Sequence, residues 1–370
     1  MPQTTAAVVD RRGAQFALRP IEVQEPRRDE ILVRVQATGM CHADLAARNG
    51  DFPFPLAGVL GHEGAGVVER IGEAVTAVRP GDLVILTFDS CGRCTGCVSG
   101  LPSQCAEFVA YNFSRGTRLD GSCTLSSADG DLHGNFFGQS SFAGYALTRE
   151  RNTIAVPDNA ADVPAQELAP LGCGIQTGAG VVLNVLQPRV GSTMAIFGAG
   201  VVGLAALMAA ALLPLREIVV VDIKDSRLEL ARKLGATQVV NSGTDDPVQA
   251  LKGLTGGGPD MVVESSGVPA VLAQAVRSLA PGGTAGVVGV PAFGATAPLD
   301  VADIVNASKR IVGVVEGQSN PPEFLPRLAT MVADGRLPVR ALVKAFPLGD
   351  IERAAEEMRS GLAVKPVLVP

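Results

Sequence analysis

The sequence of 370 residues contains no tryptophan, two tyrosines and three histidines, and it has no excess of positive charge. With 31 Lys and Arg against 37 Asp and Glu, its formal charge is −6, whereas nucleic acid or an anionic membrane requires a basic surface. The scarcity of aromatic residues also argues against platforms on which bases stack. Because 47% of the residues are hydrophobic and 18% charged, disorder is excluded for most of the chain, and the length indicates two or three domains.

Two further absences concern location. No apolar segment follows Arg11 and Arg12, so the N-terminus lacks the pattern of a secretory signal, and we expect a cytoplasmic protein with reduced thiols. The uncharged run between Arg189 and Arg216 is long enough to span a bilayer by count alone. It contains a glycine cluster at 198–203 and a proline, which favour a buried strand, a tight turn and a buried helix over a membrane span.

The organisation of the chain changes near residue 190. Before it, short β-branched runs at 31–35, 64–72 and 82–88 are bounded by Gly, Pro and Asp, as in a barrel-like domain. After it, strands alternate with helices, which predicts a parallel sheet covered on both faces. The predicted strands are 194–197, 217–221, QVV, MVVES and TAGVVGV, and the predicted helices are 201–213, 271–280 and one from an N-cap at Asp225 to Gly235.

Beyond about residue 310 the alternation stops, and two amphipathic helices, FLPRLATMVADG and IERAAEEMRSG, precede a closing strand, VKPVLV. We expect this tail to pack on the first domain. The sequence therefore predicts an α/β protein with a β-rich domain at 1–172 and 311–370, into which a doubly wound parallel-sheet domain at 173–310 is inserted.

A glycine motif lies where the first predicted strand of the second region meets its helix. It comprises Gly198, Gly200, Val201, Val202 and Gly203, and Asp222 ends the next strand 19 residues after the motif. Such a Rossmann turn approaches a pyrophosphate at a helix N-terminus, and the acid accepts hydrogen bonds from ribose hydroxyls and repels a 2′-phosphate. NAD is favoured over NADP, although Lys224 is a cation that could accommodate phosphate. A glycine turn in an ordinary α/β fold is the alternative.

Four cysteines, Cys91, Cys94, Cys97 and Cys105, fall within fifteen residues. Four thiolates suit a closed tetrahedral zinc site, which stabilises a lobe and leaves no position for chemistry. Disulfides are disfavoured by a reducing compartment, a redox CxxC motif does not supply four thiols, and an iron–sulfur cluster remains an alternative.

Three further elements are separate in sequence: GMCHAD (39–44), GHEGAG (61–66) and GCG (172–174). Each alone is weak. Together with the four cysteines and the dinucleotide motif, they resemble the zinc-dependent alcohol dehydrogenases of the medium-chain dehydrogenase/reductase superfamily, over nearly the whole chain. HGNFFGQSSFA (133–143) and GCGIQTGAG (172–180) are similar to the aryl- or benzyl-alcohol dehydrogenase branch. The resemblance implies a GroES-like catalytic domain and a Rossmann NAD domain.

The resemblance also implies a second zinc per chain, held by Cys41, His62 and Cys173 with a fourth position left for water or substrate. Asp44 matches the acid that orients the ligating histidine. Glu63 matches an acid beside the metal, with a buried structural carboxylate as its alternative.

Two basic residues match positions near the cofactor pyrophosphate in the family. They are His42 and, near the end of the chain, Lys365, for which a solvated lysine is the alternative. Cys123 and His133 are left without a role. Relatives form dimers and tetramers, so we expect a homodimer or homotetramer.

The implied reaction is hydride transfer between a primary aromatic or allylic alcohol and NAD, with an aldehyde as the substrate in reverse. Candidate apolar walls for the substrate ring are Phe52, Phe54, Phe88 and Phe136 or Phe137, although packing in the core is the commoner use of phenylalanine.

The sequence departs from the family at Ala43, where a Thr or Ser hydroxyl usually begins a proton relay, and Ala46 stands where some relatives have a relay histidine. A methyl group carries no proton. This departure leaves two alternatives open: an NAD(P)H-dependent reductase of a conjugated alkene or iminium, and a zinc- and NAD-binding protein without redox activity.

Overall fold

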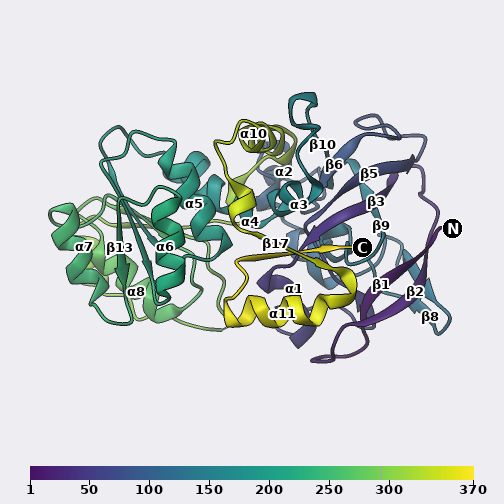
Figure 1. Cartoon of the computed structure of the whole chain (residues 1–370), viewed down its shortest axis with the longest axis horizontal. Helices are drawn as coiled ribbons and strands as arrows, with labels where there is room; N and C mark the ends of the chain where they lie inside the picture. The colour runs from purple at the N-terminus through teal and green to yellow at the C-terminus, as the bar shows by residue number, and fades with distance from the viewer. Residues whose placement is uncertain (293) are drawn as a thin grey trace. The chain divides into compact units, whose positions relative to one another are not determined.

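The computed structural model describes residues 1–292 and 294–370 and divides the chain into two compact units (Figure 1). The first unit comprises Met1–Cys173, Asn320–Gly335 and Val339–Pro370, and the second comprises Gly174–Ser319 and Arg336–Pro338. The main segment of the second unit therefore runs to Ser319, beyond the predicted boundary at residue 310. The reason is that β16 (Arg310–Gly313) adds a strand to the sheet of the second unit.

Two sheets form the first unit. One has the order β4-β1-β2-β7-β8 and the other the order β10-β6-β5-β3-β18-β17, with β9 also paired to β3. The first sheet contains β1 (Gln3–Val9), β2 (Ala17–Val23), β4 (Gly58–Val59), β7 (Leu125–Ser127) and β8 (Gly130–Leu132). The second contains β3 (Glu30–Gly39), β5 (Gly64–Ile71), β6 (Leu83–Leu86), β9 (Tyr145–Arg149), β10 (Thr153–Ala155), β17 (Val343–Pro347) and β18 (Lys365–Val369).

The C-terminal strand lies beside the strand that leads into the GMCHAD segment. Val367 of β18 is opposite Gly39 of β3, and the Met40 N–H donates to Pro366 O at 2.9 Å. The helices α10 (Pro321–Ala333) and α11 (Ile351–Ser360) precede this strand, as the sequence pattern predicted for the two amphipathic segments. Pairing across such a long sequence separation brings the end of the chain to the start of α1 (His42–Asn49).

The second unit contains one sheet of six parallel strands in the order β13-β12-β11-β14-β15-β16. The strand order changes direction between β11 and β14, and in such folds ligands bind at this switch point. The strands are β11 (Thr193–Phe197), β12 (Glu217–Asp222), β13 (Gln238–Asn241), β14 (Met261–Glu264), β15 (Thr284–Val287) and β16. The helices between or beside them are α4 (Gly174–Gly180), α5 (Val201–Ala211), α6 (Asp225–Lys233), α7 (Pro247–Thr255), α8 (Pro269–Ser278) and α9 (Val301–Asn306).

Local details differ from the sequence prediction at helix ends. Lys224, not Asp225, is the N-cap of α6, and Asp225 is its first residue. The helix α7 was missed although it begins with a good cap: the Asp246 carboxylate accepts from the N–H groups of Val248 and Gln249.

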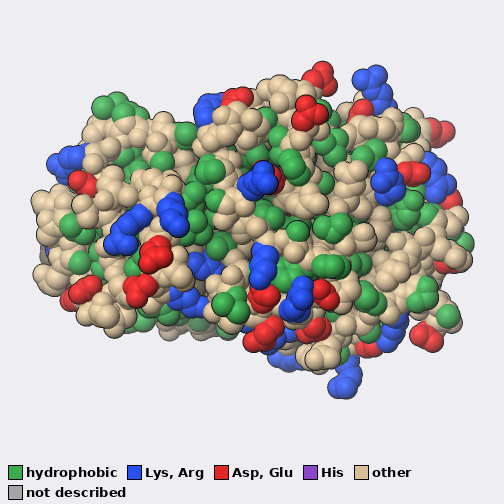
Figure 2. Space-filling view, in the orientation of Figure 1, with side chains coloured by type: hydrophobic (Ala, Val, Ile, Leu, Met, Phe, Trp, Pro, Cys, Tyr) green, Lys and Arg blue, Asp and Glu red, His purple; other side chains and the backbone are tan. Residues whose placement is uncertain are grey.

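The apolar run between Arg189 and Arg216 forms the buried strand β11 and the buried helix α5. No single helix among the described residues has the length and apolar character needed to cross a membrane. One bent pair of helices, Ala165–Gly172 with Gly174–Leu186, has the length and composition of a membrane span, but most of its residues are buried inside the protein. Basic and acidic side chains are interspersed on the face of the molecule that Figure 2 shows.

Candidate metal and cofactor sites

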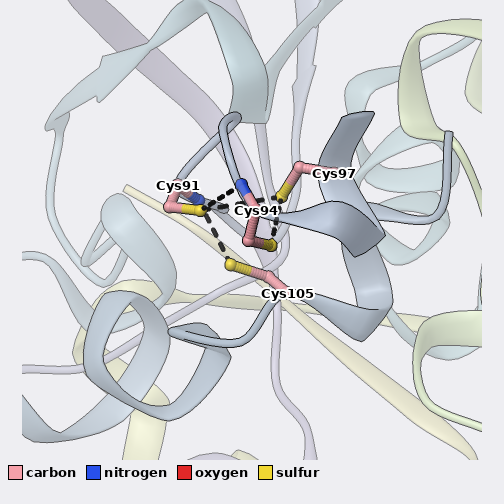
Figure 3. Close-up of side chains that lie close together, drawn as sticks. All are labelled: Cys91, Cys94, Cys97 and Cys105. Atoms are coloured by element: carbon pink, nitrogen blue, oxygen red, sulfur yellow. Dashed lines mark hydrogen bonds between the residues drawn. The ribbon is translucent and has the colours of Figure 1, made fainter. Parts of the chain in front are cut away.

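The four clustered cysteines converge around the short helix α2 (Thr95–Val98) (Figure 3). Their sulfur atoms lie within 4.8 Å of one another, with Cys94 Sγ 3.6 Å from Cys97 Sγ. Backbone N–H groups point at the sulfurs, and those of Cys97 and Ala106 lower the pKa of Cys94 to about 6. An all-sulfur donor set of this size fits a closed tetrahedral zinc site.

A second group of metal-ligating side chains comes from three separate segments of the first unit. Cys41 is the N-cap of α1, His62 and Glu63 lie in the loop before β5, and Cys173 follows the short helix Ala169–Gly172. Their ligand atoms all lie within 4.8 Å of one another. The structure therefore brings the three weak motifs GMCHAD, GHEGAG and GCG to one place.

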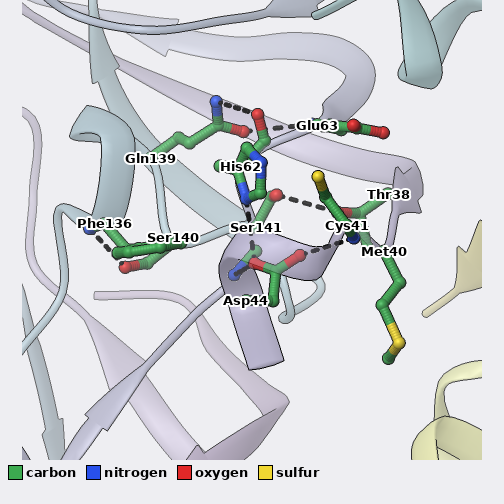
Figure 4. Close-up of polar contacts among 12 residues, drawn as sticks. Thr38, Met40, Cys41, Asp44, His62, Glu63, Phe136, Gln139, Ser140 and Ser141 are labelled. Atoms are coloured by element: carbon green, nitrogen blue, oxygen red, sulfur yellow. Dashed lines mark hydrogen bonds and ion pairs between the residues drawn. The ribbon is translucent and has the colours of Figure 1, made fainter. Parts of the chain in front are cut away.

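Asp44 connects two of these segments (Figure 4). Its fully buried carboxylate accepts the N–H of Cys41 at 2.8 Å and that of Gly61 at 3.0 Å, and it lies 2.9 Å from His62 Nδ1. Since Nδ1 donates to Asp44, the other ring nitrogen of His62, Nε2, is left to act as an acceptor. Nε2 is buried and has no hydrogen-bond partner among the described residues. An orphaned imidazole nitrogen beside two thiols fits a metal ligand.

The charges around the two thiols favour the same interpretation. The pKa of Cys41 lies well below its ordinary value, chiefly because the Cys173 thiol donates a hydrogen bond to it, with His62 and Lys365 adding to the effect and burial opposing it. Burial disfavours the His62 imidazolium, but Asp44 outweighs that effect and raises the pKa of His62 well above its usual value, so a metal at Nε2 would take the place of a proton. Two thiolate sulfurs and one imidazole make a donor set that suits zinc and leaves a fourth position open.

Lys365 is buried beside the candidate metal ligands and is not the solvated lysine that was the alternative for this position. Its side chain is fully buried, and Nζ lies 2.6 Å from Glu63 Oε1 and 3.0 Å from Met40 O. The pairing of β18 with β3 carries the ammonium into the metal site. Burial raises the pKa of Glu63 to about 7, and the Lys365 charge acts against this shift. Lys365 is therefore a counter-ion for the acid beside the metal ligands, and its contact with the cofactor pyrophosphate stays a prediction.

The other predicted residues of α1 lie at its first turns. His42 is exposed and is the first residue of the helix, while Ala43 and Ala46 are half-buried. The contact of His42 with a cofactor phosphate stays a prediction.

In the glycine motif of the second unit, the turn requires two of the three glycines and leaves the other open to a ligand. Gly198 has a φ of +93°, and a Cβ on Gly203 would lie 1.8 Å from Gly198 O, so the turn itself requires both glycines. A Cβ on Gly200 would meet no atom of the chain within 4 Å. Gly200, the second glycine of the motif, is thus not needed for packing, and the open space over it fits a ligand that approaches the backbone closely.

Asp222 lies against this turn at the end of β12. Its Oδ2 accepts the N–H of Ala199 at 2.7 Å and its Oδ1 accepts the N–H of Lys224 at 2.9 Å. Across the switch point, the Ser265 hydroxyl after β14 donates to Phe197 O at 2.8 Å. Asp222, the N-terminus of α5 and the open space over Gly200 therefore lie close together, as a dinucleotide site requires.

Aromatic rings surround the candidate metal ligands. The ring of Phe137 stacks on His62 with centroids 4.4 Å apart, and Phe136 meets His62 edge-on at 5.5 Å. Phe113 contacts Phe52, Phe136 and Phe137 at 4.8, 6.0 and 5.0 Å. Four of the five phenylalanines predicted for a pocket wall, Phe52, Phe54, Phe136 and Phe137, therefore belong to one cluster, and the fifth, Phe88, reaches it through Phe108.

Phe108 and Phe113 are the members of this aromatic cluster that the sequence analysis missed. Phe108 lies just before the segment Ala110–Ser114, which forms a π-helix, and Phe113 lies within it, so their five-residue spacing fits neither the α-helical nor the strand period. Their position directly after the four cysteines was the one available signal.

Comparison with known proteins identifies both parts of the chain. Residues 27–158 match the alcohol dehydrogenase GroES-like domain family, and residues 201–332 match the zinc-binding dehydrogenase family. Geraniol dehydrogenase of Castellaniella defragrans is 40% identical over 365 residues, which cover 98% of this chain and 97% of the relative.

Two solved structures are similar over the whole chain. Benzyl alcohol dehydrogenase from Acinetobacter calcoaceticus has 46% identity and a TM-score of 0.96, and the match covers 100% of this chain and 99% of that protein. An alcohol dehydrogenase zinc-binding domain protein from Burkholderia ambifaria has 48% identity and a TM-score of 0.97, with the same coverage.

We predict that Asp44→Asn weakens zinc binding at the three-ligand site by about 10- to 100-fold, because the neutral amide no longer fixes and polarises the His62 imidazole. Zinc content after dialysis against a graded chelator measures the effect. The four-cysteine site is expected to keep its zinc.

Asp89→Asn is the matched control, since Asp89 is a buried carboxylate whose ion-pair partner is Arg149 and not a metal ligand. Equal chelator resistance of the three-ligand site in the Asp44 variant and the unmodified protein would contradict the role given to Asp44.

Proposed function

Since the chain belongs to the zinc-type medium-chain alcohol dehydrogenases, we propose that it oxidises primary aromatic and allylic alcohols with NAD and reduces the aldehydes in reverse. Membership confirms the family resemblance, the fold class and the enzyme class predicted from the motifs, with zinc and NAD as cofactors. The substrate class depends on one observation above all, the aromatic cluster that packs against His62.

Two relatives support this substrate class. Geraniol is an allylic primary alcohol and benzyl alcohol an aromatic one, and the dehydrogenases named for them align with nearly the whole chain. A planar unsaturated group gains from contact with aromatic rings beyond the area that it buries. Phe136 and Phe137, which flank His62, supply such rings next to the metal ligands.

Each residue of the site has a distinct task in the proposed reaction. Zinc supplies a Lewis acid that lowers the pKa of an alcohol hydroxyl, and NAD supplies the hydride acceptor. Cys41, His62 and Cys173 would hold the metal, and the phenylalanines exclude water from it. In the second unit, Asp222 would bind the adenosine ribose and the glycine turn the pyrophosphate. His42 would add a positive group for the phosphates.

The proton of the alcohol has no protein hydroxyl at the family's usual position. The side chain of Ala43 is a methyl group on the first turn of α1, and Ala46 lies one turn further along. Water is therefore the proton acceptor that we propose at this position.

The protein is proposed to act in the cytoplasm. All seven cysteines are free of disulfides, and six of them lie in the two candidate metal sites. Thiols committed to metal binding suit a reducing compartment.

A panel of alcohols tests the substrate class. We expect kcat/KM with NAD for benzyl alcohol, cinnamyl alcohol and geraniol to exceed that for ethanol by about 10- to 100-fold, because burial of the ring or alkene contributes roughly 1.5–3 kcal/mol. Initial rates of NADH formation measure this ratio. Equal rates with ethanol would contradict the substrate class, and saturated aldehyde formed from cinnamaldehyde and NADH would show a reductase of the conjugated alkene instead.

Restoring the missing hydroxyl is expected to raise turnover. Ala43→Thr should increase kcat for benzyl alcohol oxidation by about 10-fold or more, since a positioned proton acceptor contributes on this scale or above. Ala43→Val has nearly the same shape without the hydroxyl and serves as the control. The same kcat in the Thr and Val variants would show that the proton path does not depend on this position.

We also propose a homodimer or homotetramer in which β16 meets the same strand of a second copy. β16 is an edge of its sheet among the described strands, Ile311 is exposed in it, and Val290, Val301 and Val305 are exposed near it in sequence. An open apolar edge is a template for pairing.

Light scattering tests this arrangement. It should give twice or four times the chain mass of 38.0 kDa, and Ile311→Lys should lower the measured mass. A mass of one chain for the unmodified protein would contradict this arrangement.

A further inference from the structure

Gln139 is a buried amide at the centre of the first unit that none of the tasks above uses. Its side chain is 2% exposed, and it lies in the loop between Phe136 and Ser141 (Figure 4). A buried primary amide costs free energy unless its two N–H groups and its oxygen are all paired. The identity of its partners therefore indicates what the residue does.

All three groups of the Gln139 amide have partners on the metal-site backbone. Nε2 donates to His62 O at 2.9 Å and to Thr87 O at 3.0 Å, and Oε1 accepts the N–H of Gly64 at 3.0 Å. Two carbonyls and one N–H around the amide determine its orientation, because the flipped amide would place its oxygen against both carbonyls.

These bonds hold the backbone on both sides of Glu63 and directly after the ligand His62. Thr87 extends the connection, because its hydroxyl donates to Gly172 O at 2.6 Å, one residue before the ligand Cys173. Asp44, by comparison, connects the segment of Cys41 with that of His62. The path from Gln139 through Thr87 is a side-chain connection between the segments of the second and the third ligand.

We propose that Gln139 is a positioning residue that sets the spacing of His62 and Cys173, and through that spacing the affinity and geometry of the zinc site. The proposal rests on the zinc site of the proposed function. Gln139 acts through the ligand backbones and touches neither substrate nor cofactor, so its effect is on metal binding first and on turnover as a consequence.

The loop that carries Gln139 is held independently of the amide. The Ser140 hydroxyl donates to Val59 O at 2.6 Å and accepts the N–H of Phe136, and the Asn152 amide donates to Gly138 O at 2.9 Å. Removing the Gln139 hydrogen bonds therefore leaves the loop anchored. The loss is confined to the His62, Gly64 and Thr87 backbones.

Gln139→Met tests the proposal, since methionine has a similar length and volume and neither donates nor accepts strongly. The variant is expected to lose about 10- to 100-fold in zinc affinity at the three-ligand site and to keep its four-cysteine zinc. Chelator titration gives the affinities, and visible absorption of the cobalt-substituted protein reports the ligand geometry without any turnover.

Thr87→Val interrupts the same connection at its other end with a milder change. If the two residues act as one path, the double variant loses less affinity than the product of the two single losses. Gln176→Met is the matched control: Gln176 is also fully buried, and its amide pairs with Ser319 and Glu316 in the second unit. It should leave the cobalt spectrum unchanged.

An unchanged affinity and cobalt spectrum in Gln139→Met would overturn the proposal, as would an equal loss from both metal sites, which indicates general destabilisation. Independent, multiplicative losses in Gln139→Met and Thr87→Val would also count against one path. If the unmodified protein itself holds no metal at the three-ligand site, the proposed function fails rather than the role of Gln139.

Discussion

The buried carboxylate of Asp44 is the interaction on which the metal site depends. An ionised acid without solvent is costly unless its oxygens are paired, and Asp44 meets this condition with two backbone N–H groups and the His62 ring. It is also the third residue of α1, where the helix N-terminus favours negative charge. The same three hydrogen bonds that make its burial tolerable bring together two ligand segments that are far apart in sequence.

The charge balance of the site explains why a cation belongs there. The thiols of Cys41 and Cys173 and the carboxyls of Asp44 and Glu63 are potential negative charges in one buried region, and Lys365 brings a single ammonium to it. A buried excess of negative charge is unfavourable. A divalent cation between the two sulfurs and His62 Nε2 offsets it, so metal binding and the stability of this region are linked.

The sequence predicted the features that short spacings determine. The four cysteines, the glycine turn and Asp222 each have a geometry set by neighbouring residues, and the structure brings together the four cysteine sulfurs and places Asp222 against the glycine turn. The resemblance of GMCHAD, GHEGAG and GCG to a family provided the second set of ligands, which spacing alone left undetermined. Strand β16 and helix α7 were not predicted, although neither is shorter than the predicted β14 and α6.

Residues whose roles depend on distant partners could not be predicted in this way. Lys365 is one residue of a closing strand in sequence, and only the pairing of β18 with β3 shows that its ammonium reaches Glu63. Gln139 lies in a loop, and the sequence of this loop does not predict that the side chain is buried and bonds to three backbone groups. In both cases the decisive partners come from strands and loops that are remote in the chain.

X-ray absorption at the zinc edge, combined with metal analysis, tests the central claim most directly. The account predicts two zinc ions per chain, one surrounded by four sulfurs and the other by two sulfurs and lighter N or O ligands. A single zinc per chain with only sulfur ligands would contradict it, because Cys41, His62 and Cys173 would then lie together without the cation that their arrangement requires.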